Sequence, residues 1–205
     1  IGFPVVVKPT DGNHGRGVFI DLMSREEVAK AYAIAIEEGS GVLVERSIQG
    51  IEHRLLIVGG KLVAANRSDL ITVTGDGKST VLELIDTQVN TDPRRGTTEL
   101  HPLSIIKIDT AARMELERQK LDADSVPAAG REVLIQRNAN HAFDCTDEVH
   151  PDTAAVASLA ARVVGLDIAG IDLVCQDISK PLAEQGGAIV EVNAGPSLLM
   201  HIKPG

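Results

Sequence analysis

Short apolar runs surround one helical stretch over the first 47 residues of the chain. Three of these runs are rich in β-branched residues and predict strands, at residues 5–8, 18–22 and 42–45. Ser24 and Glu27 have the spacing of a capping box, which predicts a helix start. Apolar side chains then recur at helical intervals up to a glycine stop, at Val28, Ala31, Tyr32, Ala35, Ile36 and Gly39. We therefore predict a small α+β lobe over residues 1–47.

Further apolar runs after Gly50 predict a second lobe, over residues 48–205. Two apolar runs around Gly59-Gly60, at residues 52–58 and 61–66, predict the strands of a hairpin. Further strands are predicted at residues 71–74, 132–136, 168–175 and 188–193. A helix from Ser79 is predicted to direct Leu82, Ile85 and Val89 inward, and another helix begins near Thr110.

The last predicted helix begins at Pro151, a residue typical of a first helical turn. Its apolar positions predict one buried face, made of Val156, Leu159, Ala160, Val163 and Val164. Mixed strands with helices on one side predict an α+β architecture.

Composition and charge exclude several classes of protein. The net charge of −9 is unfavourable for binding to a nucleic-acid backbone, so we expect no nucleic-acid partner. No apolar run approaches the roughly 20 residues that cross a bilayer, so we expect no membrane span. Cys145 and Cys175 lack metal-ligand spacing and are typical of reduced thiols in a cytoplasmic protein. Because the first residues already read as a strand, we expect a segment of a longer enzyme.

Lys8 and the glycine-containing segment 12–17 form the first candidate site. A lysine at a strand end can reach a phosphate, and glycines let backbone N–H groups approach phosphate oxygens. The spacing matches neither a P-loop nor a dinucleotide-binding fingerprint. The alternative is a flexible surface hairpin. If the segment 11–17 is a lid over a nucleotide, we expect it to be mobile when no nucleotide is bound.

Two carboxylates, Glu45 and Glu52, flank the predicted junction of the lobes and form the second candidate site. A carboxylate can accept hydrogen bonds from both hydroxyls of a ribose, and backbone groups of the junction can read an adenine edge. The alternative is that both are solvated surface acids beside an arginine.

The third candidate site combines Asp172 with Glu191 and Asn193. Residues two apart in a strand share a face, so Glu191 and Asn193 project together. Asp172 lies within an apolar strand, where a carboxylate is costly unless it is paired or bound to metal. Two carboxylates and an amide oxygen suit Mg²⁺. The alternative is pairing with an internal arginine or lysine, but the apolar flanks offer few such partners, which favours a metal.

The order of these features resembles the ATP-grasp superfamily over essentially the whole chain. Within it, several strings are similar to the cyanophycin synthetase family: KPTDGNHGRG at 8–17, EHR at 52–54, GDGKST at 75–80, NTDPRRG at 90–96, RNAN at 137–140 and TDEVHP at 146–151. The chain departs from the family at residues 66–70 and 141–145, where the resemblance would place the peptide substrate.

The resemblance implies ATP and Mg²⁺ as cofactors and assigns roles to individual positions. The implied nucleotide-binding residues are Lys8, Gly12, Asn13, His14, Gly15, Arg16, Gly17, Glu45, Arg46, Ile48 and Glu52. Arg67 and Arg137 are implied as the catalytic cations, and Asp172, Glu191 and Asn193 as the magnesium ligands. The implied substrate residues are Arg54, Asn138, Gly195 and Ser197.

The implied reaction adds aspartate to the backbone carboxylate of an acidic peptide primer, through an acyl phosphate. The resemblance further implies a Mur-ligase-like domain in the same parent chain and a homo-oligomer of the full-length enzyme. Alternatives are a glutathione- or glutamate-ligase relative, an enzyme that joins aspartyl-arginine units, and a nucleotide-binding module without catalysis.

Overall fold

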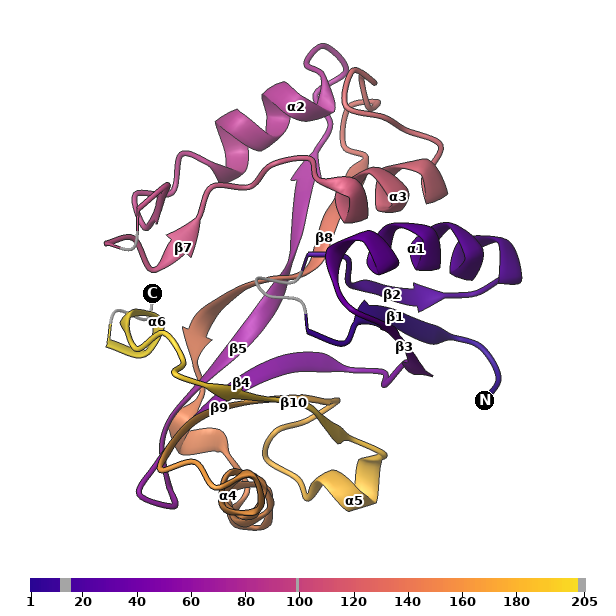
Figure 1. Ribbon diagram of the computed structural model, residues 1–205. Helices are drawn as coiled ribbons and strands as arrows, with labels where there is room; N and C mark the ends of the chain where they lie inside the picture. Colours follow the sequence, from indigo (N-terminus) through magenta and orange to yellow (C-terminus); the bar gives the residue numbers. More distant parts are fainter. Residues whose placement is uncertain (12–15, 99, 203–205) are drawn as a thin grey trace. The chain divides into compact units, whose positions relative to one another are not determined.

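The computed structural model describes residues 1–11, 16–98 and 100–202, without the side chains of residues 138–142, 200 and 202 (Figure 1). The chain divides into two compact units. The first contains residues 1–47 and 108–114, and the second contains residues 48–107 and 115–205. Residues 108–114, assigned to the second lobe from sequence, thus group with the first 47 residues. The functional division into lobes at 1–47 and 48–205 stays a prediction.

The first unit is a three-stranded antiparallel sheet with one helix. The sheet order is β2-β1-β3, and the elements are β1 (Val5–Pro9), β2 (Phe19–Leu22), α1 (Arg25–Glu38) and β3 (Val42–Arg46). Its core consists of side chains from β1, β2 and α1, with two partly buried residues of α3 (Thr110–Arg118) packed against them: Val5, Val7, Phe19, Leu22, Ala31, Ala35, Ala111 and Met114.

Helix α1 confirms the predicted capping box, because Ser24 Oγ accepts from Glu27 N and the Glu27 carboxylate accepts from Ser24 N. Only part of the apolar stripe of this helix is buried. Ala31 and Ala35 are fully buried, whereas Tyr32 and Ile36 are 47% and 41% exposed. Alanines at i and i+4 let the helix approach the sheet closely, so its contact stripe is narrower than the apolar pattern suggests.

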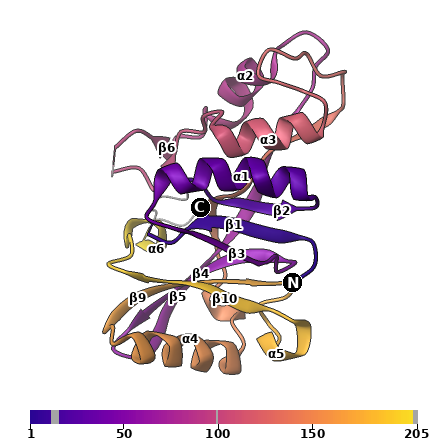
Figure 2. The same cartoon turned by 45° about the vertical axis from the view of Figure 1, so that its right-hand side comes forward.

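The second unit is built on a five-stranded antiparallel sheet of order β10-β9-β4-β5-β8 (Figures 1 and 2). Its strands are β4 (Ile51–Val58), β5 (Lys61–Thr74), β8 (Glu132–Asp144), β9 (Ile168–Cys175) and β10 (Ala188–Ala194). The predicted hairpin about Gly59-Gly60 is confirmed as β4 and β5. The prediction of separate strands before and after residues 67–70 is wrong: β5 is continuous, with register shifts at 67/68, 69/71 and 71/72.

Helix α4 (Pro151–Val164) packs on one face of this sheet and begins at the predicted proline. Its predicted buried face is wrong except at Ala160, which is partly buried against the core. The helix buries its small residues Thr153, Ala157 and Ala161. Four residues of the predicted face are instead 45% to 78% exposed, namely Val156, Leu159, Val163 and Val164. Small side chains again allow the closest approach of helix and sheet.

Shorter elements complete the second unit. They are α2 (Val81–Leu84), η1 (Ile85–Val89), β6 (Arg95–Gly96), β7 (Leu103–Ser104), η2 (Thr146–Glu148), α5 (Leu182–Gln185) and α6 (Leu199–Ile202). The helix predicted from Ser79 has Thr80 as its N-cap instead, and Glu83 closes the capping box. Leu82, predicted to face inward, is 45% exposed. Within the described residues, no helix is both long and apolar enough to cross a membrane.

Gly50, directly before β4, lies so close to the backbone of Cys175 that only glycine fits there. Its φ is +144°, and an added Cβ would collide with the backbone carbonyl of Cys175. We expect Gly50→Ala to lower the free energy of unfolding by more than about 2 kcal/mol, because strain and a backbone clash add. Gly59→Ala is the matched control: its φ is +57° with open space around it, so only about 1 kcal/mol should be lost. Urea denaturation of both variants compares the two losses, and equal losses would contradict the clash.

Candidate functional site

One row of polar residues crosses the entire five-stranded sheet. Strand pairing places Glu191 opposite Asp172, Asp172 opposite Arg54, Arg54 opposite Asn66, and Asn66 opposite Asp144. Directly opposed residues share a face of a sheet, so all five lie on one face. We call these five residues the polar row. It brings together residues from β10, β9, β4, β5 and β8, which lie far apart in the sequence.

Asp172 is the most buried carboxylate of the polar row, with a side chain that is 3% exposed. Arg54 donates to both of its oxygens, from Nε to Oδ1 and from Nη2 to Oδ2, each at 2.6 Å. Such a bidentate pair fixes the orientation of the carboxylate. The prediction that Asp172 has few cationic partners nearby is therefore wrong, because the arginine comes from a neighbouring strand that is distant in sequence.

Glu191 and Asn193 converge on Asp172 as the strand periodicity predicts. Asn193 Nδ2 donates to Asp172 Oδ2 at 2.9 Å and to Glu191 Oε2 at 3.3 Å. The three predicted metal ligands therefore occupy one spot at the β9–β10 pairing. Their assignment to a metal stays a prediction.

Glu52 lies near this cluster. Burial, and then the negative charge of Asp172, raise the pKa of the Glu52 carboxyl to about 7, with a further rise from Glu191 and an opposing effect of Arg54. The carboxylates of Glu52, Asp172 and Glu191 thus surround a single guanidinium, that of Arg54. When all four groups are ionised, their formal charge is −2.

This donor set fits a divalent cation. Oxygen atoms of two carboxylates and one amide are what Mg²⁺ prefers, and the surplus negative charge favours a cation. In the structure Asn193 turns its N–H groups toward Asp172 and Glu191, so metal ligation would use its Oδ1 instead. Within the described part of the chain, no group of three or more His, Cys, Asp or Glu side chains alone has the arrangement of a metal site.

The predicted nucleotide-binding residues of the first unit are only partly described. Lys8 Nζ forms an ion pair with Glu45 Oε2 at 2.8 Å, which joins the first and second candidate sites. Arg16 Nε lies 4.0 Å from Glu38 Oε2, and Gly17 has a φ of +71°. Four predicted residues lie outside the described residues, namely Gly12, Asn13, His14 and Gly15, and the predicted lid mobility lies there too.

The junction residues Arg46 and Ile48 lie on opposite sides of the boundary between the units. Arg46 is the last residue of β3 and is exposed, and Ile48 is half-buried in the segment before β4.

Arg67 is not brought to the polar row. It is opposed to His53 and Phe143, which alternate with Arg54 and Asp144, so it lies on the other face of the sheet. Its guanidinium carbon lies 5.5 Å from the centre of the Phe143 ring, and its Nε lies 3.5 Å from Asp69 Oδ1 without a hydrogen bond. This placement gives no support to a role for Arg67 at a phosphoryl group.

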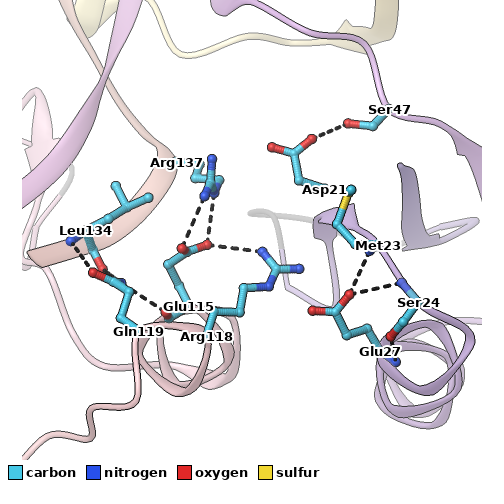
Figure 3. A network of polar contacts seen from close by, with 10 residues as sticks. All are labelled: Asp21, Met23, Ser24, Glu27, Ser47, Glu115, Arg118, Gln119, Leu134 and Arg137. Atoms are coloured by element: carbon cyan, nitrogen blue, oxygen red, sulfur yellow. Dashed lines mark hydrogen bonds and ion pairs between the residues drawn. The ribbon is translucent and has the colours of Figure 1, made fainter. Parts of the chain in front are cut away.

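Arg137 is held by a glutamate that the sequence analysis did not single out. Glu115 on α3 accepts from Arg137 Nε at 2.9 Å and from Nη2 at 3.2 Å, and it also accepts from Arg118 at 3.2 Å (Figure 3). Glu115 is 8% exposed. Helical spacing puts Glu115 near Arg118, but no local pattern predicts the contact with β8.

The predicted substrate residues lie at three separate places. Arg54 pairs with Asp172, as described. The backbone of Asn138 belongs to β8, but its side chain lies outside the described residues. Gly195 makes a turn with a φ of +65° directly after β10, and Ser197 is exposed in the following segment.

The chain is similar to known proteins over nearly its whole length. No family model matches the chain. The chain is 46% identical to cyanophycin synthetase of Synechocystis over 99% of its length, and it spans 24% of that protein. It is 34% identical to the glutathione biosynthesis bifunctional protein GshAB of Clostridium perfringens, over 98% of the chain and 26% of the relative. The chain thus spans about a quarter of the length of these curated relatives.

Solved structures agree with the sequence comparison. The bifunctional glutathione synthetase of Pasteurella multocida superposes with a TM-score of 0.55 and 32% identity, over 98% of this chain and 28% of that one. The D-alanine–D-alanine ligase of Bacillus anthracis, at 18% identity and a TM-score of 0.52, covers 97% of this chain and 46% of its own and shares the fold. The chain therefore has the ATP-grasp fold, and over nearly its whole length it is similar to a part of the cyanophycin synthetases.

Proposed function

We propose that this chain is the catalytic ATP-grasp part of a Mg²⁺-dependent carboxylate–amine ligase that adds aspartate to the backbone carboxylate of cyanophycin. The convergence of Asp172, Glu191 and Asn193 carries the proposal, because an oxygen-donor cluster of this kind suits the metal that accompanies a triphosphate. The 46% identity to a cyanophycin synthetase supports the choice of polymer.

In this proposal most of the nucleotide-binding residues belong to the first unit, and Ile48 and Glu52 belong to the second. Lys8 contacts the α- and β-phosphates, and the segment 12–17 covers the triphosphate. The Lys8–Glu45 ion pair holds the lysine at the end of β1 until phosphate oxygens compete for it. Glu45, Arg46 and Ile48 contact the adenine, and Glu52 accepts from the ribose.

The second unit performs phosphoryl transfer. The substrate carboxylate takes the γ-phosphoryl group, which brings two anions together, so positive charge must be supplied. Asp172, Glu191 and Asn193 would hold Mg²⁺, whose charge would balance that of the phosphates. Arg54 keeps the Asp172 carboxylate in one orientation through its bidentate contact. Arg137 supplies a further cation after it exchanges Glu115 for the phosphoryl group.

The amino group of the incoming aspartate then displaces phosphate from the acyl phosphate. Gly195, Ser197 and Asn138 line the acceptor side in this proposal, because the turn at Gly195 directly follows the strand that carries Glu191 and Asn193. Arginine addition belongs to a separate Mur-ligase-like domain of the complete polypeptide, which we further propose forms a homo-oligomer.

One experiment tests the substrate assignment directly. The complete natural polypeptide is incubated with ATP, Mg²⁺ and a cyanophycin primer, and ADP release is compared across single amino acids. We expect aspartate to drive release that depends on the primer. Release with γ-glutamylcysteine and glycine instead would favour a glutathione-type ligase, an alternative supported by the 34% identity to GshAB.

Two other outcomes distinguish the remaining alternatives. ADP release only with preformed aspartyl-arginine dipeptides would identify an enzyme that joins such units. ATP binding without ADP release under any of these conditions would indicate a nucleotide-binding module and would overturn the ligase proposal.

A further inference from the structure

His201 on α6 has buried ring nitrogens without a hydrogen-bond partner among the described residues. Both Nδ1 and Nε2 lack solvent exposure, and neither donates or accepts. A buried imidazole nitrogen is normally satisfied, so an unsatisfied pair points to a partner that the described chain does not supply. None of the sequence motifs described above includes His201.

The position of His201 relates it to the polar row. Helix α6 contacts β5 and β8, the two strands that carry Asn66 and Asp144 (Figures 1 and 2). The charges of Arg54 on β4 and Asp144 on β8 both act on the ring. Since Arg54 and Asp144 flank Asn66 in the row, the contacts of α6 and the charges acting on its imidazole both relate His201 to the middle of the row.

The surroundings keep the imidazole neutral. Burial, and then the positive charge of Arg54, lower the pKa of His201 below its ordinary value, with an opposing effect of Asp144. From β5 the row contributes the uncharged Asn66. A neutral imidazole has one nitrogen able to accept a proton at physiological pH.

We infer that His201 is the general base that accepts a proton from the attacking amino group of the acceptor amino acid. The inference rests on the proposed ligase function. An amino group is mostly protonated at neutral pH and must lose two protons to become an amide nitrogen. One passes to the free imidazole nitrogen, the nitrogen lone pair forms the C–N bond, and the C–O bond to phosphate breaks. Phosphate leaves with that electron pair and carries the second proton.

The test compares two nucleophiles in the complete polypeptide. Aspartate must be deprotonated before it attacks, whereas hydroxylamine is largely uncharged at neutral pH and needs no base for that step. We expect His201→Gln to slow aspartate ligation by about 100-fold or more and to leave hydroxamate formation from the primer at the wild-type rate. His101→Gln, at an exposed histidine of the same unit, should leave both rates unchanged.

The pH profile gives an independent readout. Wild-type kcat for aspartate should fall as pH drops through the lowered pKa of His201, because protonation removes the base. The hydroxylamine reaction should lack this fall. His201→Ala should recover aspartate ligation when imidazole is added, which also shows that the variant has folded.

Three results would overturn the inference. Equal slowing of both nucleophiles by His201→Gln would assign His201 to binding or phosphoryl transfer, and unchanged rates for both would remove it from the reaction. A His201→Ala variant that keeps the wild-type circular dichroism spectrum but gains no activity from imidazole would also contradict a proton-accepting role. A wild-type polypeptide that forms neither product would instead overturn the ligase proposal itself.

Discussion

Replacing Glu191 with glutamine is expected to abolish backbone ligation while leaving the fold intact. Glutamine keeps the shape and can still accept the hydrogen bond that Asn193 Nδ2 donates to Glu191 Oε2. It removes one negative charge from the proposed metal ligands, so charge on the transferring phosphoryl group is no longer balanced. We expect ADP release with aspartate and primer to fall by about 100-fold or more.

The arginine-adding domain that we propose for the complete polypeptide provides a control for this variant. Arginine addition to a supplied poly-aspartate primer, assigned to the separate Mur-ligase-like domain, should continue in Glu191→Gln. Glu184→Gln, an exposed position on α5, should preserve both additions. Extension of an arginine-bearing primer by Glu191→Gln at near wild-type rate would disprove the assignment of this site to backbone ligation.

Removing Asp172 is expected to cause the largest loss of stability. Asp172→Ala leaves Arg54, whose side chain is 21% exposed, without its bidentate partner. Breaking one side of a buried ion pair costs about 3–5 kcal/mol, because the remaining charge is uncompensated. Urea denaturation of the variant should show this decrease in the free energy of unfolding.

A double variant of Arg54 and Asp172 distinguishes the contribution of this pair to stability from its contribution to metal binding. Arg54→Met with Asp172→Leu replaces both charges by apolar side chains and should recover most of the lost stability. It should not recover Mn²⁺ binding, measured by electron paramagnetic resonance as a stand-in for Mg²⁺. Glu26→Ala, at an exposed ion pair with Lys30 on α1, should change stability little. A fully stable Asp172→Ala variant would contradict the structural importance of the pair.

Signals between near neighbours in the chain predicted the fold well. The capping box at Ser24, the hairpin at Gly59-Gly60 and the helix start at Pro151 depend on a few adjacent residues, and all three are confirmed. The ATP-grasp fold itself follows from the order of the motifs and is confirmed by solved relatives.

Contacts between distant strands were not predictable in the same way. The periodicity of β10 predicted that Glu191 and Asn193 project together, but the pairing of Arg54 with Asp172 depends on the order of strands in the sheet. Glu115 is a similar case, since only the approach of α3 to β8 places it against Arg137.

Apolar patterns also misjudged which face of a helix is buried. In α4 the valines and the leucine are the largest apolar residues, yet the buried core positions are Ala157 and Ala161. Hydrophobicity alone does not record how closely a helix must approach its neighbour. The small volume of the alanine side chains determined which face of α4 is buried, as it did for Ala31 and Ala35 in α1.

The grouping of residues 108–114 with the first 47 residues has a consequence for biosynthesis. The core of that unit is completed by Ala111 and Met114, so the ribosome must first translate the whole segment 48–107. Until then the surface that these two side chains cover stays open, and a nascent chain in this state is exposed to aggregation. Closing so long a loop costs only slightly more entropy than closing a shorter one. This arrangement therefore delays folding of the first unit during translation, and it has little effect on the stability of the finished protein.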